Sequence, residues 1–84
     1  KNYSPLTQKA ITFIDTDLTA DLSLRTISQA LNISSSYLST IFKKETGMTI
    51  TDFIAQRRVE RAKELLRTTR LQIQTIAQHC GIPD

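Results

Sequence analysis

The chain contains one cysteine and one histidine, and the two are neighbours at Cys80 and His79. A nucleophilic thiol needs a base that reaches it, and a metal site needs three or four convergent ligands. No second cysteine or histidine is present, and no glycine-rich phosphate loop occurs. We therefore predict no catalytic residue, no metal site, no cofactor and no enzyme activity. Cys80 is expected to be a small buried hydrophobic residue.

A second polar group has a spacing with chemical meaning. Its members are three or four residues apart, as on one exposed face of a helix: Ser35, Ser36, Ser39, Thr40 and Lys43. Short hydroxyl side chains can meet base edges or phosphates, a lysine can neutralise a phosphate, and a helix N-terminus favours an anion. Serines alone more often form a solvated polar face, so the surrounding elements decide between these interpretations.

Those elements predict a helix-turn-helix over residues 22–47. Ser23 is placed to cap a first helix, and Ser34 a second one that ends at Gly47. Ser28 is a small residue where the helices would cross, and Asn32 tolerates the left-handed conformation that the turn needs. The second helix, residues 34–46, then has a free face that can enter a DNA groove.

An internal repeat supports this interpretation. A shift of 49 residues aligns LSLRTISQALNI, residues 22–33, with LQIQTIAQHCGI, residues 71–82, with five identities in twelve positions. The apolar positions stay in phase, Asn32 falls on Gly81, and Leu31 falls on Cys80. Residues 71–84 are therefore expected to begin a second helix-turn-helix unit, which is incomplete because its own recognition helix would follow Asp84.

Two further helices are expected. One begins at Ser4 and Pro5 and carries an apolar stripe formed by Leu6, Ala10, Ile14 and Leu18. The other is a long linker helix over residues 49–68, with Thr49 as its cap and Asp52 three residues later. On this helix one face is expected to carry Ala55, Val59, Ala62 and Leu66, and the neighbouring face Ile54, Arg58, Arg61 and Leu65. No strand pattern is present, so the predicted fold class is all-α.

Composition narrows the class of protein. The chain has 84 residues, 39% hydrophobic residues and a net charge of +3, with eight of its eleven cations within residues 43–70. This size suits one small domain, and no apolar run approaches the length of a membrane span. The basic excess favours an anionic partner. A single cysteine and the lack of a signal-peptide pattern indicate a cytoplasmic protein.

With these motifs in place, the sequence resembles the DNA-binding domain of the AraC/XylS family of bacterial transcription regulators. The residues that carry the resemblance span nearly the whole chain: Leu24, Ile27, Leu31, Ile33, Ser34, Tyr37, Leu38, Ser39, Phe42, Lys43, Lys44, Glu45, Thr46, Gly47, Phe53, Ile54, Arg58, Val59, Ala62, Leu65, Leu66, Ile76, Ala77 and Gly81. The resemblance implies one homeodomain-like domain over residues 1–84. Its parts would be a first unit at 1–47, a linker helix at 49–68 and the start of a second unit at 71–84.

The resemblance also implies a function, namely sequence-specific DNA binding in which helix 34–46 enters the major groove. By position within the motif, Ser36, Ser39 and Thr40 would face bases. Ser35, Tyr37 and Lys43 would lie near phosphates. A linker helix of roughly 30 Å is close to the roughly 34 Å between successive major grooves on one side of DNA.

The expected partner is double-stranded DNA, with RNA polymerase as a further candidate and no membrane. A sugar-binding sensor or a phosphorylated receiver domain is expected before this domain and could form a dimer. Two alternatives remain. One is a helical module that binds a protein rather than DNA. The other is a unit of an alkylation-repair protein, similar to this one, which would carry a cysteine-rich metal site upstream.

Overall fold

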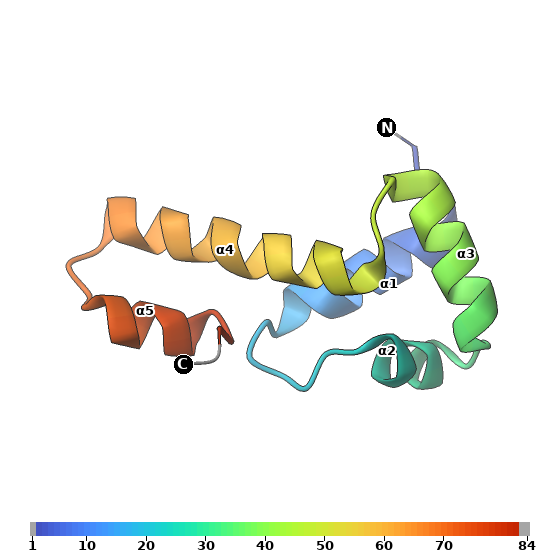
Figure 1. Ribbon diagram of the computed structural model, residues 1–84, viewed down its shortest axis with the longest axis horizontal. Helices are drawn as coiled ribbons and strands as arrows, with labels where there is room; N and C mark the ends of the chain where they lie inside the picture. Colours follow the sequence, from blue (N-terminus) through green and yellow to red (C-terminus); the bar gives the residue numbers. More distant parts are fainter. Residues whose placement is uncertain (1, 83–84) are drawn as a thin grey trace.

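A computed structural model describes residues 2–82 of the chain, and every regular element in that range is an α-helix. The five helices follow one another along the chain: α1 (Pro5–Thr16), α2 (Leu24–Leu31), α3 (Ser35–Thr46), α4 (Ile50–Thr68) and α5 (Ile73–His79). Figure 1 shows α1, α2 and α3 gathered at one end of α4, with α5 beside its other end. The prediction of an all-α fold is confirmed over the described residues.

The helices begin where the capping residues predict. The side chains of Ser4, Ser23, Ser34 and Thr49 each accept a hydrogen bond from the backbone N–H three residues later. Each cap satisfies one of the N–H groups that the first turn of a helix leaves without a partner. Two helices end on residues with positive φ, α2 at Asn32 (58°) and α3 at Gly47 (79°). These local signals therefore set the helix boundaries.

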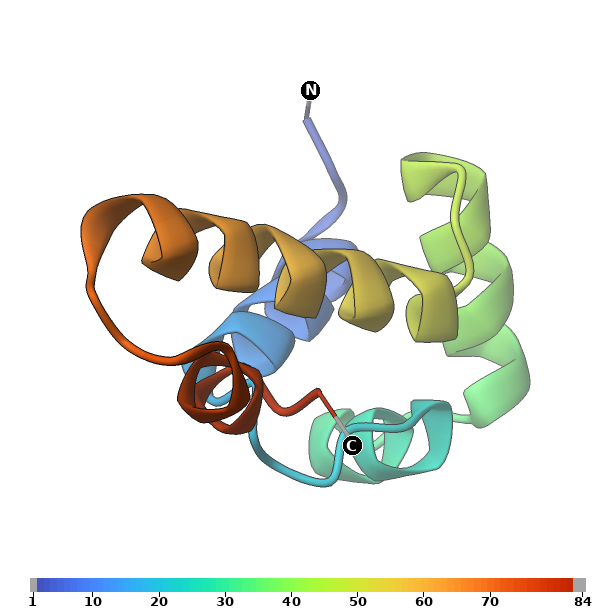
Figure 2. The same cartoon turned by 60° about the vertical axis from the view of Figure 1, so that its left-hand side comes forward.

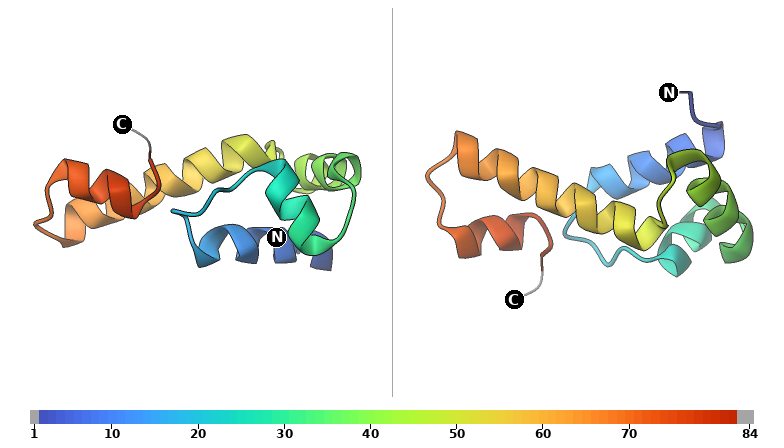
Figure 3. Two further views of the ribbon diagram at one scale, coloured as in Figure 1. Left: turned by 90° about the horizontal axis from the view of Figure 1, so that it is seen from below. Right: turned by 45° about the horizontal axis from the view of Figure 1, so that its top comes forward.

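The molecule is elongated, with dimensions of 41 × 25 × 17 Å. Helix α1 packs on both α2 and α3, and α4 packs on α3 at one end and on α5 at the other. Figures 2 and 3 show that α5 folds back along the distal half of α4 after a short loop. The long helix thus connects a three-helix unit to a second, smaller one.

The main core lies where α4 begins. It contains eight buried side chains from α1, α2, α3 and α4: Ala10, Ile14, Ile27, Leu38, Phe42, Ile50, Phe53 and Ile54. The rings of Phe42 and Phe53 meet edge to face, with centroids 5.1 Å apart and planes at 88°. Such a pair adds roughly 0.5–1.5 kcal/mol to the area that the rings bury. This contact joins α3 to the first turns of α4.

The apolar side chains of α4 are not all buried on one face. Of the face formed by Ala55, Val59, Ala62 and Leu66, the two large side chains lie in solvent, Val59 at 46% and Leu66 at 53% exposure. The neighbouring face at Ile54 and Arg58 packs inward instead. Leu18, expected to continue the stripe of α1, lies after the helix, which ends at Thr16. The loop between α1 and α2 therefore supplies Leu18 as a contact for α4.

Arg58 joins three separate segments. Its Nε donates to the carbonyl oxygen of Leu18 at 2.9 Å, and its Nη2 donates to that of Ala20 at 3.1 Å. Gly81 lies against the same place, because a Cβ added to it would be 2.1 Å from the Leu18 oxygen and 3.0 Å from Arg58 Nε. The α1–α2 loop, the middle of α4 and the turn after α5 thus meet at one guanidinium group.

The internal repeat is also present in three dimensions. The N–H of Ile33 donates to the Ser28 carbonyl at 3.0 Å, and the N–H of Ile82 donates to the Ala77 carbonyl at 2.9 Å. The turn residues Asn32 and Gly81 both have positive φ. Two hydrogen-bonded turns of the same form, 49 residues apart, confirm that α5 begins a second copy of the α2 unit.

The two copies differ in how the N-terminus of their first helix is capped. Ser23 caps α2 with its side chain, whereas Gln72, at the same place before α5, makes no side-chain cap. Cys80 is fully buried in the second copy, as predicted, and burial raises the pKa of its thiol. A thiol that stays protonated behaves as a small hydrophobic side chain.

We predict that Gly81→Ala destabilises the protein more than Gly47→Ala does. Both residues have positive φ, so each substitution carries a backbone strain of roughly 1–2 kcal/mol. Nothing lies within 4 Å of a Cβ at Gly47, whereas a Cβ at Gly81 collides with the Leu18 carbonyl. That collision should add roughly 1–3 kcal/mol. Urea unfolding of both variants measures the difference, and equal losses would contradict the close packing at Gly81.

We also predict an acid-dependent effect of Glu45→Gln. The Ser4 N–H donates to Glu45 Oε1 at 2.8 Å, and this bond holds the pKa of Glu45 below its ordinary value. The folded state thus favours the ionised form, so the stabilisation is present at neutral pH and is lost as the pH falls through the lowered pKa. Glu45→Gln should therefore lower the urea midpoint more at about pH 7 than at about pH 3. The same difference at both pH values would contradict this account.

Candidate nucleic-acid interface

Helix α3 has one buried side and one free side. Leu38 and Phe42 are fully buried against the core, and Ile41 is half-buried. The opposite side carries the polar residues singled out in the sequence: Ser35, Ser36, Ser39, Thr40 and Lys43. Figure 1 shows α3 at the outer edge of the molecule, away from α5. The first unit therefore presents this side of α3 to solvent.

Four of the six predicted contact residues lie together on one shallow hollow. Ser35, Ser36, Ser39 and Thr40 line it, and it has a volume of about 300 Å³. The fifth lining residue is Leu24, the first residue of α2. The three residues predicted to face bases thus share one surface.

Ser35 has a structural bond as well as its place on this surface. Its Oγ lies 2.8 Å from Ser28 Oγ, and Ser28 Oγ donates to the Arg25 carbonyl at 3.0 Å. Because a hydroxyl group has one proton, Ser28 must accept at the first of these contacts and Ser35 must donate. The Ser35 hydroxyl then has only lone pairs to offer, whereas a phosphate oxygen needs a donor. Ser35 would therefore reach a phosphate through its backbone N–H, in the first turn of α3.

The other two predicted phosphate contacts lie outside the hollow. Tyr37 is 56% exposed in the first turn of α3, and Lys43 is exposed in the last turn beside Lys44. The described residues contain no ion pair for either lysine. Tyr37 is thus exposed on α3 without lining the hollow, and the two exposed lysines follow the hollow toward the C-terminal end of the helix.

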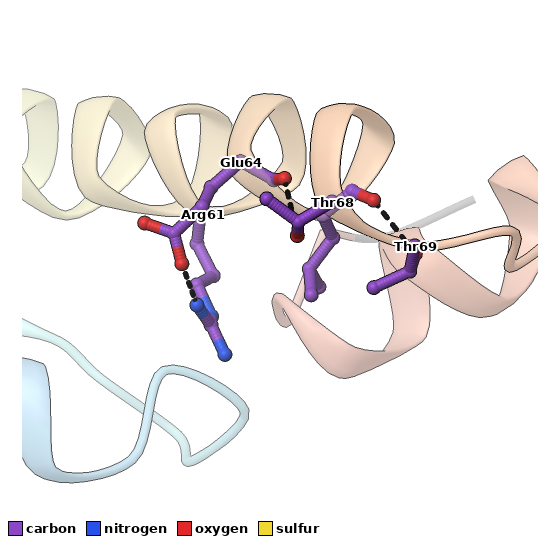
Figure 4. Close-up of polar contacts among 5 residues, drawn as sticks. Arg61, Glu64, Thr68 and Thr69 are labelled. Carbon is purple, nitrogen blue, oxygen red and sulfur yellow. Dashed lines mark hydrogen bonds and ion pairs between the residues drawn. The ribbon is translucent and has the colours of Figure 1, made fainter.

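Several arginines of α4 contact other groups of the same domain. Arg57 lies 3.3 Å from Asp15 and 3.8 Å from Glu60, and its guanidinium carbon is 4.8 Å from the centre of the Phe53 ring. Its Nε has no directed hydrogen bond, so the contact with Asp15 is an ion pair only. Arg61 pairs with Glu64 one turn later (Figure 4).

Two threonine hydroxyl groups bind backbone carbonyls at the C-terminal end of α4. The side chains of Thr68 and Thr69 donate to the carbonyls of Glu64 and Leu65 at 2.8 and 2.7 Å (Figure 4). The Leu65 carbonyl also accepts from the Thr69 N–H at 3.0 Å, so the Thr69 hydroxyl adds a second hydrogen bond there. Arg57 pairs with α1 through Asp15 and Arg61 pairs within α4, so part of the basic stretch noted in the sequence makes contacts inside the domain.

Other kinds of site find no support in the described range. A larger cleft of about 610 Å³ lies between the end of α1 and α4, but its walls alternate carboxylates with Arg57, Arg61 and His79. Residues 2–82 contain no group of three or more metal-ligating side chains. Within the same residues, no helix combines the length and the apolarity needed to cross a membrane.

A family model described as "Helix-turn-helix domain" matches residues 27–84, which is most of the chain. This match covers α4, the second copy of the repeat, and the first copy from Ile27 onward. The chain belongs to the AraC/XylS family of helix-turn-helix transcription regulators. It is therefore a DNA-binding domain of a transcription regulator and not an enzyme, and its partner is double-stranded DNA.

The similar proteins agree with this assignment. The HTH-type transcriptional activator Btr of Bacillus subtilis is 32% identical over 92% of this chain and 15% of that protein. The Msm operon regulatory protein of Streptococcus mutans is 37% identical over 77% of this chain and 23% of that protein. The C-terminal domain of AraT, a response regulator from Geobacillus stearothermophilus, has a TM-score of 0.91 at 34% identity, over 96% of this chain and 68% of that one. The chain thus spans less than a quarter of either curated relative.

Leu24 on this surface and Ser28 beneath it were not singled out for function by the sequence pattern. Leu24 is an apolar residue in the first turn of α2, and Ser28 fits the small position where two helices cross. The structure places Leu24 on the hollow and Ser28 in contact with Ser35. Leu24 stands one turn before the crossing residue, at the start of its helix, and that position is the signal that could have indicated its exposure.

Proposed function

We propose that α3 enters the major groove of DNA and that its free side reads sequence there. Ser36, Ser39 and Thr40 would face base edges, while Tyr37, Lys43 and the N-terminal turn at Ser35 would lie against phosphates. The observation that carries the proposal is that the three base-facing residues line one hollow on the exposed side of the second helix of a helix-turn-helix. That helix is the one that enters the groove in this motif.

The dimensions of α4 support a second point of contact. Its 19 residues correspond to roughly 28 Å at 1.5 Å per residue. Successive major grooves on one side of DNA are roughly 34 Å apart. A second recognition helix following α5 would therefore lie near the next groove. Two contacts of this kind would share the sequence specificity between them.

We further propose that this domain is part of a larger cytoplasmic regulator. AraT, whose C-terminal domain has the same fold, is described as a response regulator. A receiver domain, or a sugar-binding sensor, placed before α1 would suit this chain as well, and such a domain could form the dimer. A DNA-bound regulator of this kind would then contact RNA polymerase.

Titration of the natural full-length protein on fluorescent DNA duplexes tests the proposal. Affinity should fall with rising salt, because bound phosphates release counterions, and it should differ between duplex sequences. A module that binds a protein through its helical surface would show neither behaviour. Affinity that depends on neither salt nor sequence would therefore overturn the DNA-reading role.

We predict that Lys43→Ala weakens binding to all duplexes by a similar factor. If Lys43 neutralises one phosphate, the slope of log affinity against log salt should fall by about one. Lys63→Ala, which removes an exposed lysine of α4, is the matched control and should leave the slope unchanged. An unchanged slope for Lys43→Ala, or an effect confined to one sequence, would contradict the phosphate role.

Thr40→Ala should instead change which duplexes are preferred. Loss of one base contact is expected to change the ratio of affinities between the best site and a site altered at that base by about 3- to 10-fold. Thr12→Ala, at an exposed position of α1, is the control for the loss of a threonine hydroxyl. If Thr40→Ala lowers all affinities equally, Thr40 does not read a base.

A further inference from the structure

The hollow on α3 contains no side chain of the kind that reads purines through paired hydrogen bonds. Arginine and lysine recognise guanine in this way, and asparagine and glutamine recognise adenine. The residues that line the hollow are three serines, a threonine and a leucine: Ser35, Ser36, Ser39, Thr40 and Leu24. Reading at this place must therefore use shorter groups.

Among the contacts that such short side chains can make in the major groove, apolar contact with the 5-methyl group distinguishes thymine from the other bases. A hydroxyl can both donate and accept, so a serine meets many base edges with little preference. The lining residues have two apolar groups larger than a serine methylene, namely the isobutyl group of Leu24 and the methyl group of Thr40. Both belong to the same hollow. The apolar part of the reading surface is thus contributed by α2 together with α3.

The position of Leu24 relative to α3 is fixed by two sets of bonds. Ser23 caps α2 directly before it, with Ser23 Oγ accepting from the Thr26 N–H at 3.0 Å. One turn later, Ser28 meets Ser35 of α3 at 2.8 Å between their hydroxyl oxygens. Leu24 is half-buried as a result, whereas Ile73, its counterpart in the second copy, is 70% exposed. A half-exposed leucine whose position is fixed in this way can make the same van der Waals contact each time the helix enters a groove.

We infer that Leu24 and Thr40 together recognise the 5-methyl group of a thymine in the DNA site. This inference rests on the proposed entry of α3 into the major groove. It makes Leu24 a specificity-determining residue although it lies outside the recognition helix. The hydroxyl groups of Ser36 and Ser39 then form hydrogen bonds with neighbouring base edges. The contact with the methyl group is what selects thymine.

Replacement of thymine by deoxyuridine tests the inference, because it removes the methyl group and nothing else. The probe is the duplex that the natural full-length protein selects from a random-sequence library, with each thymine replaced in turn. At one position, the replacement should weaken binding by about fourfold, the equivalent of burying one methyl group. If no single replacement weakens binding while sequence preference remains, the inference fails and the proposed function stands. If the protein shows no sequence preference, both fail.

Two variants of one residue assign the effect to the named side chains. Thr40→Ser keeps the hydroxyl and loses the methyl, so the fourfold effect of deoxyuridine should shrink towards none. Thr40→Val keeps the methyl and loses the hydroxyl, so the effect should persist although overall affinity falls. Thr12→Ser, on α1, should retain the full effect. A fourfold effect that survives Thr40→Ser would overturn the role of Thr40.

Leu24→Ala should also reduce the effect of deoxyuridine at the same thymine. Leu24 packs in part against the core. The circular dichroism spectrum and melting curve of the variant are therefore measured together with its DNA affinity. If this variant unfolds, Leu24→Val is measured instead. Valine stays apolar, but its side chain is shorter and reaches less far. An unchanged ratio of thymine to deoxyuridine affinity in a folded variant would overturn the role of Leu24.

Discussion

The arrangement of the molecule depends on the guanidinium group of Arg58. It donates to the carbonyls of Leu18 and Ala20, which follow α1, and it lies against Gly81, which follows α5. A planar group with several fixed donors can hold two carbonyls in one geometry, which a lysine cannot. The first unit, the linker helix and the start of the second unit are thereby held at one point. The glycine is required there by contact as well as by its positive φ.

The surface proposed to meet DNA is likewise made by contacts between elements. α3 supplies the hydroxyl groups, but the bond between Ser28 and Ser35 places α2 beside it, and α2 supplies Leu24. The Phe42–Phe53 contact then fixes the far end of α3 to α4. A helix held by contacts at both ends keeps its free side in one orientation. A fixed orientation is needed to read a base edge, because a displaced hydroxyl loses its hydrogen bond.

The basic character of the chain has two separate uses. Arg57, Arg58 and Arg61 bind carboxylates or carbonyls of the domain itself. Lys43 and Lys44 lie exposed at the end of α3 and have no ion pair among the described residues. Net charge alone therefore overstates the positive surface available to DNA. The lysines at the end of α3, rather than Arg57, Arg58 and Arg61, are the cations available beside the proposed recognition surface.

Local sequence determined the helices, their caps, the 49-residue repeat and the family, because capping bonds and apolar spacing act within a few residues. Ser4, Ser23, Ser34 and Thr49 are each found where their side chains predict. The tertiary structure alone decided which side of α4 is buried, so that Val59 and Leu66 lie in solvent while Arg58 turns inward. It also decided that Leu24 reaches the surface of α3. The orientation of Arg58 depends on Leu18, 40 positions earlier, and the place of Leu24 depends on the packing of α2 against α3. No short-range pattern in the sequence encodes either contact.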